Sequence, residues 1–315
     1  MTGYVANRLA QGILVLFLIS LVTFSLINFA PGGPSSLVSM ESTAEQREAR
    51  LRQYGLDQPA PVRYLRWLAG AVRGDLGDSI NQGLPVERLL VQRMTVTLQL
   101  AGYAMLLTAV FGILFGVLGA LHHNRWPDHI VSVVTTLGMS VPNFWLGIVA
   151  IIVFAVTLGW LPAAGNATLG GGFDLSDRLR HAVLPAGVLA FSLMPNVVRV
   201  TRSALLEVLA SDFVRTARAK GLPQRGIVWK HTLRNALVPV ISILGLITTV
   251  LLSGSVVIES VFGWPGLGRL AIDAASGRDY PVILGVTVMV GALTVIVNLV
   301  VDLLYAVADP RIRYG

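Results

Sequence analysis

Six long apolar stretches dominate the sequence, and most of the segments between them are short and polar. The stretches cover residues 9–30, 96–121, 130–158, 183–206, 237–262 and 282–307. The first has 22 residues without a charge, and as a helix it would be about 33 Å long, enough to cross a hydrocarbon core of about 30 Å. The pattern predicts an all-α integral membrane protein with six transmembrane helices.

One polar segment, between the first two stretches, is long enough to form a domain. We therefore divide the chain into an N-terminal segment with the first span (1–30), an extracytoplasmic loop domain (31–95) and a transmembrane core (96–315). Residues 31–94 contain eight Arg and seven Asp or Glu, and a helix is predicted over 43–53. This domain is either a plain solvated surface or a contact surface for an extracytoplasmic partner, because loops of this length usually have a task.

A cleaved signal peptide is the alternative interpretation of residues 9–30. The apolar region of a signal peptide is usually only about 7–15 residues long and is followed by a small-residue cleavage motif. Neither feature is evident in this sequence. An uncleaved first span is therefore favoured.

Composition narrows the class further. The chain is 54% hydrophobic, is 13% charged and contains no cysteine, which excludes disulfides, thiolate catalysis and cysteine-bound metals. A net charge of +7 is compatible with nucleic-acid binding. The basic residues, however, flank membrane spans and lack interleaved stacking aromatics, so we expect no nucleic-acid partner and regard these residues as determinants of topology and of a protein contact.

The distribution of positive charge predicts the orientation of the chain. With six spans both termini share one side, which carries twelve Arg and Lys, whereas the two short loops on the other side carry four. Positive residues in short loops mark the cytoplasmic side. We expect a multi-pass membrane protein with both termini in the cytoplasm.

The polar stretch 211–235 concentrates charge without balancing acid, holding six of the 24 Lys and Arg. Ser211 or Asp212 can cap a helix over 213–220, Gly221 can adopt the left-handed closing conformation, and Pro223 prevents the helix from resuming. On this helix Phe213, Val214 and Ala217 share one face, and Arg215 and Arg218 point roughly the other way. An isolated helix this short is only marginally stable in water. We therefore expect it to be held by docking onto another part of the protein or onto a partner.

Patterns for several catalytic chemistries are missing from the sequence. Neither lysine lies in a phosphate-binding loop, and the five histidines lack metal-ligand spacing. Gly138, Ser140 and their neighbours lack the closing glycine of a nucleophile elbow. We therefore expect no directly bound cofactor, no metal and no catalytic residue.

Several residues within the spans invite a structural or a functional explanation. Gly112 and Gly116 form a G-x-x-x-G pair that permits close helix approach. Pro142, Pro185 and Pro195 can bend helices, for packing or as gating hinges, and packing is favoured.

Two carboxylates, Glu259 and Asp302, lie where water is scarce. Asp302 should face protein or a wet cavity because a carboxylate near the bilayer centre costs about 2.5–3.5 kcal/mol. A structural pair of Asp302 with Arg199 or Arg202 is favoured over a proton or ion relay.

Several short runs resemble those of the ATP-binding-cassette importer permeases of the dipeptide/oligopeptide group. The strongest is the run Asp212, Phe213, Val214, Arg215, Thr216, Ala217, Arg218, Ala219, Lys220 and Gly221. It is followed by His231-Thr232-Leu233-Arg234-Asn235. Supporting runs cover residues 140–147, 259–268, 302–305 and 309–313. The runs occur in the same order as in that family, and the six spans and the long first loop extend the resemblance over the whole chain. Of the two permeases that form a pair in such importers, this chain is most similar to the one with the large first periplasmic loop.

The resemblance implies a type I ABC importer permease of a prokaryotic cytoplasmic (inner) membrane, in which residues 207–237 form a cytoplasmic coupling loop. The helix within it would dock on an ATPase subunit, with Phe213, Val214 and Ala217 buried and Arg215, Arg218 and Lys220 at the partner's polar rim. The implied partners are a second homologous permease in a heterodimer, two ABC ATPase subunits that bind ATP and Mg²⁺, an extracytoplasmic substrate-binding protein and membrane lipid. Di- and oligopeptides are the implied substrates, with nickel chelates or glutathione as alternatives.

The run departs from the broad importer pattern E-A-A-x-x-x-G, because Arg215 and Thr216 stand at its first two positions. Peptide-type permeases resemble this sequence more closely there. Two other function classes remain as alternatives: a self-sufficient secondary transporter, which predicts inverted repeats and several deep ionisable groups, and an intramembrane enzyme. The sequence shows neither set of features.

Overall fold

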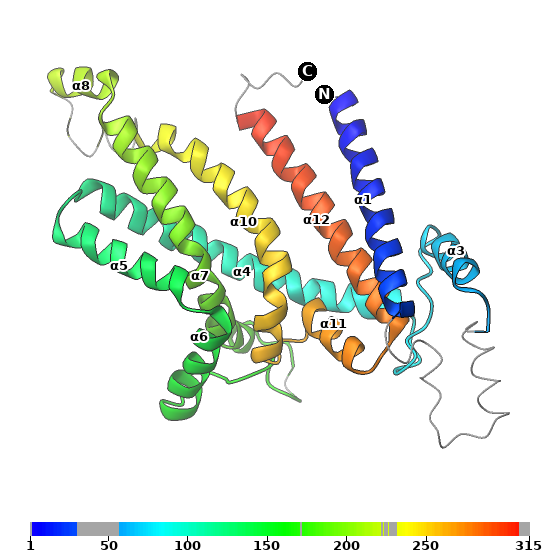
Figure 1. Ribbon diagram of the computed structural model, residues 1–315. Coiled ribbons are helices and arrows are strands. Elements are labelled where there is room, and N and C mark those ends of the chain that lie inside the picture. The colour runs from blue at the N-terminus through cyan, green and yellow to red at the C-terminus, as the bar shows by residue number, and fades with distance from the viewer. Residues whose placement is uncertain are drawn as a thin grey trace. The chain divides into compact units, whose positions relative to one another are not determined.

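The computed structural model describes residues 2–29, 57–170, 172–221, 223, 226 and 232–308. The predicted helix over 43–53 lies outside them. In the described residues every regular element is helical, and extended segments pair only at an isolated bridge between Asp78 and Pro85. The all-α prediction is confirmed (Figure 1).

The helices are α1 (Thr2–Phe29), α3 (Ala60–Ala71), α4 (Val86–Leu121), α5 (Trp126–Ser140), α6 (Asn143–Ala150), the π-helix η2 (Ile151–Thr157), α7 (Leu175–Leu209), α8 (Asp212–Ala219), α10 (Leu233–Val261), α11 (Leu267–Ser276) and α12 (Tyr280–Ala308).

Four described helices are long and apolar enough to cross a membrane unaided, namely α1, α4, α7 and α12. Two bent pairs bring the number of candidate spans to six. One pair lies within α10, on either side of a bend of 53°, and the other joins α5 to α6 and η2 at 103°. The second bend lies where the chain requires it, because Val141 before Pro142 is extended, as residues preceding proline usually are. The third predicted span is therefore sharply bent between α5 and α6, as in a broken span or a re-entrant loop.

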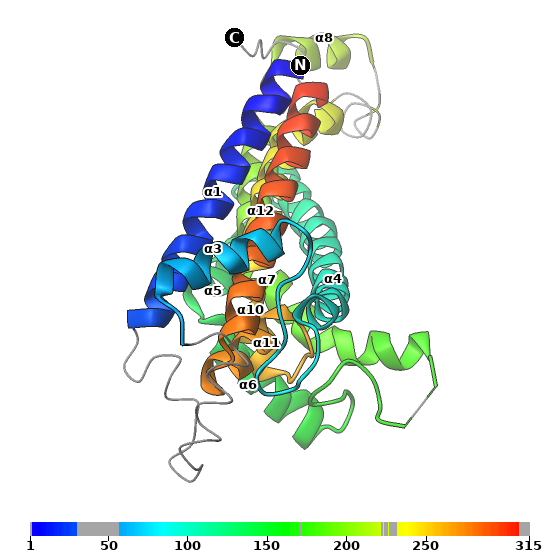
Figure 2. The same ribbon diagram turned by 90° about the vertical axis from the view of Figure 1, so that its right-hand side faces the viewer.

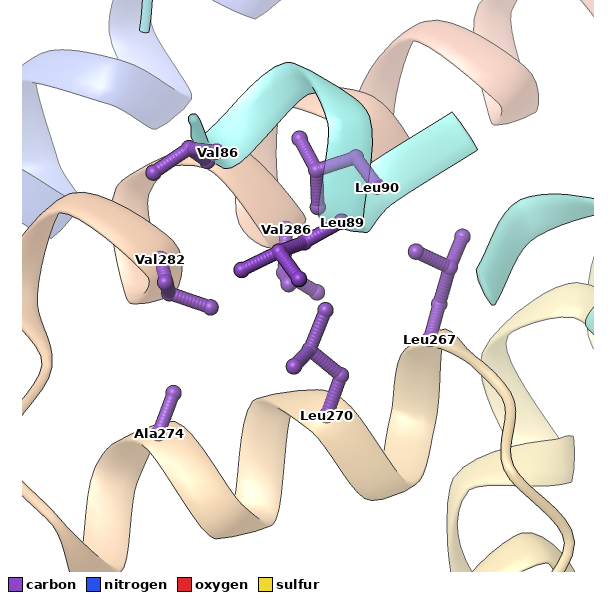
Figure 3. Packing of buried hydrophobic residues seen from close by; sticks show 8 residues of the cluster. All are labelled: Val86, Leu89, Leu90, Leu267, Leu270, Ala274, Val282 and Val286. Carbon is purple, nitrogen blue, oxygen red and sulfur yellow. The ribbon is translucent and has the colours of Figure 1, made fainter. Parts of the chain in front are cut away.

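Two compact units divide the chain, and both α4 and α12 contribute to each of them. The first unit contains residues 1–97 and 265–296. Its core joins the start of α4 to α11 and α12 through Val86, Leu89, Leu90, Leu267, Leu270, Ala274, Val282 and Val286 (Figure 3). Because Val86 and Leu90 are fully buried there, α4 begins ten residues before the span predicted from position 96. The charges of Glu87, Arg88 and Arg93 had hidden this extension.

The second unit contains residues 98–264 and 297–315. Within it α7 is central and packs against α5, α6 and α10. The G-x-x-x-G pair does permit the close helix approach that was predicted. A Cβ on Gly112 would lie 2.6 Å from Cβ of Val197, and a Cβ on Gly116 would lie 2.5 Å from Cβ of Thr201. The small residues thus let α4 and α7 meet closely. Helix α7 is continuous through Pro185 and Pro195, both buried.

Candidate functional site

The polar stretch after α7 contains the short helix and the left-handed glycine that the sequence predicted. Helix α8 covers Asp212–Ala219, and the backbone carbonyl of Ser211 accepts hydrogen bonds from the amides of Val214 and Arg215, both at 3.2 Å. Gly221 follows with φ of +75°, the left-handed conformation that glycine adopts without strain. The hydroxyl of Ser211 donates back to the carbonyl of Val208, so it secures the end of α7.

The described side chains of α8 divide sharply between one buried residue and an exposed polar surface. Val214 has no solvent exposure, so it packs inside this chain. Asp212 and Arg215 are highly exposed and lie 3.5 Å apart. Thr216 and Lys220 are also exposed. The side chains of Phe213, Ala217 and Arg218, and most of residues 222–231, lie outside the described part of the structure. Val214 thus attaches the helix, while the exposed residues can contact a partner.

A cluster of three polar side chains ties the start of α5 to α7. Arg202 of α7 donates from Nε and Nη2 to the two carboxylate oxygens of Asp128, each at 2.8 Å. The amide of Asn124 donates to the same carboxylate at 3.0 Å, and Nδ1 of His123 lies 3.0 Å from Arg202 Nη2. Because Asp128 is 3% exposed, this is a largely desolvated, two-pronged ion pair of the strong kind.

The position of this cluster connects it to α8. Arg202 lies seven residues before the end of α7, about 10 Å along the helix axis. A Cβ on Gly119 of α4 would lie 3.2 Å from Asp128 Oδ1. The cluster therefore joins α4, α5 and α7 just before the chain enters α8. Sequence reasoning missed it, although an acid in the first turn of an apolar span was a usable signal.

The two intramembrane carboxylates take no part in this cluster. Arg202, suggested as a partner of Asp302, binds Asp128, and Arg199 donates to Asn196 at 3.3 Å. Asp302 is half-buried on α12. Glu259 is fully buried on α10 and accepts a hydrogen bond from Ser255 at 3.3 Å. Arg202, one of the two suggested partners of Asp302, is thus paired with Asp128 instead.

An apolar cavity of about 340 Å³ lies between the end of α4 and the start of α5. Phe115, Leu118, Trp126, Ile130 and Val134 are among its lining residues, with His122 and Thr135 as polar members. None of its lining residues in the described part of the chain is a Lys, Arg, Asp or Glu that could orient a peptide. In the residues that the structure describes, no three His, Asp or Glu side chains gather in a way that could hold a metal ion.

Comparison with sequence families gives two adjoining matches. Residues 112–314 match the family described as binding-protein-dependent transport system inner membrane component. Residues 1–101 match the N-terminal region of the membrane component of such systems. Together the two matches cover nearly the whole sequence.

Individual relatives are similar over their full length. The oligopeptide transport system permease protein AppB of Bacillus subtilis is 43% identical, with all of both chains covered. A putative peptide transport system permease protein of Brucella abortus is 41% identical with the same coverage. The glutathione transport system permease protein GsiC of Escherichia coli is 40% identical, again over the whole of both chains.

Solved structures share the fold at lower sequence identity. An inward-facing structure of the MetNI methionine ABC transporter has a TM-score of 0.58 at 21% identity, covering 70% of this chain and 96% of that one. A structure of an amino acid ABC transporter with histidines has a TM-score of 0.51 at 17% identity, covering 71% and 94%. The likeness establishes the transmembrane architecture.

Proposed function

Because the chain belongs to the family of binding-protein-dependent transport system inner membrane components, we propose that it is one permease subunit of an ABC importer for di- or oligopeptides. The names of relatives at 41–43% identity support peptides as substrates. The glutathione permease at 40% identity makes that tripeptide the second candidate.

The observation that carries the proposal is the construction of α8. It is short, it is held to the chain by buried Val214, and it presents exposed Arg215, Thr216 and Lys220. A helix with one attached face and one free polar face suits docking on a second protein. We propose that this protein is an ABC ATPase subunit, that the complete transporter has two of them with ATP and Mg²⁺, and that this chain has no catalytic site.

The same geometry suggests how motion passes into the membrane. A displacement of α8 acts directly on α7, because only Ala210 and Ser211 separate the two helices. Arg202 and Asp128 carry that displacement to the start of α5, which leads into the bend at Pro142. ATPase closure would thus move α7 and the bent third span together, around a path shared with a second permease that receives peptide from a binding protein.

Co-purification tests the role of α8. A tagged chain is extracted from its membrane in mild detergent, and its companions are identified by mass spectrometry. We expect a second permease and ATP-binding subunits, and we expect the double variant Arg215→Glu with Lys220→Glu to lose the ATP-binding subunits. The matched control is Arg180→Glu, an exposed arginine near the other end of α7. Equal loss in the control, or retention in the double variant, would contradict the proposal.

Reconstitution tests the substrate. Liposomes containing the purified complex and its binding protein should accumulate labelled dipeptides only with internal ATP, and excess unlabelled glutathione should not compete. Competition by glutathione would favour the second candidate. Accumulation by this chain alone, without ATP-binding subunits, would establish a secondary transporter instead.

Labelling tests the proposed cytoplasmic location of α8. Because the chain has no cysteine, a single introduced cysteine can be followed without background. Lys220→Cys should react with a membrane-impermeant maleimide only after permeabilisation, whereas Gln82→Cys, exposed between α3 and α4, should react in intact spheroplasts. The reverse pattern would invert the topology.

A further inference from the structure

Helix α3 packs against the first membrane span through an aromatic cluster. Tyr64 of α3 is buried and shares a hydrogen bond of 2.9 Å with Ser20 of α1. Its ring lies 5.2 Å from that of Phe24 and 6.3 Å from that of Phe17, between centroids. Arg63 donates to the side-chain oxygen of Asn28. In both Figure 1 and Figure 2, α3 lies beside the C-terminal half of α1.

These contacts occur at a depth where hydrocarbon is expected. The candidate span in α1 covers Val5–Phe29, and Ser20 lies nine residues before its end, about 14 Å along the axis. Ser20 is also near the middle of the uncharged run 9–30. Since a Tyr hydroxyl stands only a few ångströms from its own backbone, Tyr64 places part of α3 within the thickness of the membrane.

The opposite face of α3 is also apolar and is uncovered in the described structure. Val62, Leu65 and Val72 are 45%, 63% and 81% exposed, and Ala69 between them is exposed too. This spacing of three and four residues forms one stripe on a helix. Arg66 and, just past the helix, Arg73 are exposed beside it. Helix α3 contains no acidic residue.

We propose that α3 is an interfacial helix, inserted in the leaflet opposite that of the chain's N-terminus. Val62, Leu65 and Val72 contact lipid acyl chains, while Arg66 and Arg73 extend to lipid phosphates. An amphipathic helix with Arg on its polar side and large apolar groups on the other is suited to lie at this boundary. Long Arg side chains reach the headgroups from apolar surroundings.

Two observations favour lipid over a protein partner at this face. The helix that carries the stripe packs against α1, whose own apolar side chains Phe17, Leu21 and Phe29 are 40%, 38% and 86% exposed. The positive charge of α3, without acid, complements phosphate groups. The inference concerns the membrane placement of residues 60–73, so it is independent of the substrate and of the ATPase partners.

Site-directed spin labelling tests the proposal. In the cysteine-free chain, a nitroxide is attached to Leu65→Cys, and the complex is reconstituted in vesicles of phosphatidylethanolamine and phosphatidylglycerol. Collisions with oxygen, which concentrates in lipid, are compared with collisions with a water-soluble nickel chelate. The lipid reference is Leu14→Cys on α1, exposed at 57%, and the aqueous reference is Gln82→Cys, exposed in the loop before α4.

We expect the label at position 65 to favour oxygen, as the label at position 14 does. Preference for the nickel chelate, as at position 82, would overturn the proposal by showing a hydrated helix. Low accessibility to both reagents would also overturn it, because a protein subunit would then cover the stripe. A second label at Val62→Cys guards against local disturbance and should give the same preference. None of these readings requires ATP or transport.

Discussion

Arg202 and Asp128 form two parallel hydrogen bonds of 2.8 Å that join α7 to the first turn of α5. The carboxylate is 3% exposed, and the amide of Asn124 and the ring of His123 complete its surroundings. A guanidinium fork matched to a carboxylate fixes angle as well as distance. The pair therefore fixes the start of α5 against α7, the helix that leads into α8.

Removing the charge of Asp128 should loosen this connection. We expect Asp128→Asn to lower the free energy of unfolding by about 1.5–3 kcal/mol, the typical value for a hydrogen bond to a charged group. A double-mutant cycle with Arg202→Gln, read from denaturation of the purified chain in detergent, checks it. The two changes should be strongly non-additive, because each removes the same interaction. Additive losses would show that the pair contributes little.

The exposed histidine of the cluster provides a control for that cycle. His123 is 47% exposed, and solvent weakens interactions of this kind. We expect His123→Ala to change stability far less than Asp128→Asn does. A comparable loss would place the main contribution in the histidine.

The close approach of α4 to α7 predicts a steric effect at Gly116. A Cβ there would lie 2.5 Å from Cβ of Thr201, so Gly116→Val must push the helices apart, at a cost of about 1–3 kcal/mol. Gly102 on the same helix has no neighbouring atom within 4 Å of a Cβ. Gly102→Val is therefore the matched control. Lower thermal stability is expected for the first variant only, and equal stability would mean that α4 and α7 are free to separate.

Local patterns predicted much of the fold. The apolar stretches identify the spans, and the sequence around α8 predicts both the short helix and the left-handed Gly221, because caps, glycine and proline act within a few residues. The early start of α4 at Val86 could not be predicted in the same way. Val86 and Leu90 stay helical and buried because α11 and α12 cover them, and the charges between them conceal this.

The pairing of Arg202 depends on the path of the chain, since 74 residues separate it from Asp128. Sequence reasoning suggested Asp302 as the acid instead. The pattern did predict a bend at Pro142, but the angle of 103° depends on packing against α7 and α10. The role of Val214 was also out of reach, because the sequence shows an apolar face without showing that its own chain covers it.

A buried carboxylate at the start of α12 predicts a second stability effect. Asp279 is 2% exposed and accepts hydrogen bonds from the Ser79 hydroxyl at 2.5 Å and from the amides of Ile80 and Asn81 at 3.1 and 3.2 Å. Asp279→Asn should reduce thermal stability, because the NH₂ group of Asn is itself a donor and cannot accept the hydrogen bonds that a carboxylate oxygen accepts. We expect a loss of about 1.5–3 kcal/mol.

The control for Asp279 is a carboxylate exposed to solvent in the same unit. Asp273 is 62% exposed and lies 3.8 Å from Arg269, a surface pair of the kind that contributes about 0–1 kcal/mol. Asp273→Asn should leave the unfolding transition nearly unchanged. If both variants behave alike, the hydrogen bonds to Asp279 do not hold the turns at 79–81 and 277–279 together.

The turn after α8 allows conformational strain to be separated from coupling. Gly221 has φ of +75° and no atom within 4 Å of a built Cβ, so a substitution there acts through the backbone alone. Gly221→Val should strain the turn by about 1–2 kcal/mol and redirect α8. We expect ATP-driven uptake by the Gly221→Val variant to fall strongly while the protein remains in the membrane. Gly221→Asn should retain most activity, because Asn tolerates this conformation.

The control for Gly221 is Gly159, which has φ of +64° and is equally open. Gly159→Val therefore imposes the same strain away from α8 and should preserve uptake. Normal uptake with Gly221→Val, or equal losses at both glycines, would show that the turn does not set the coupling.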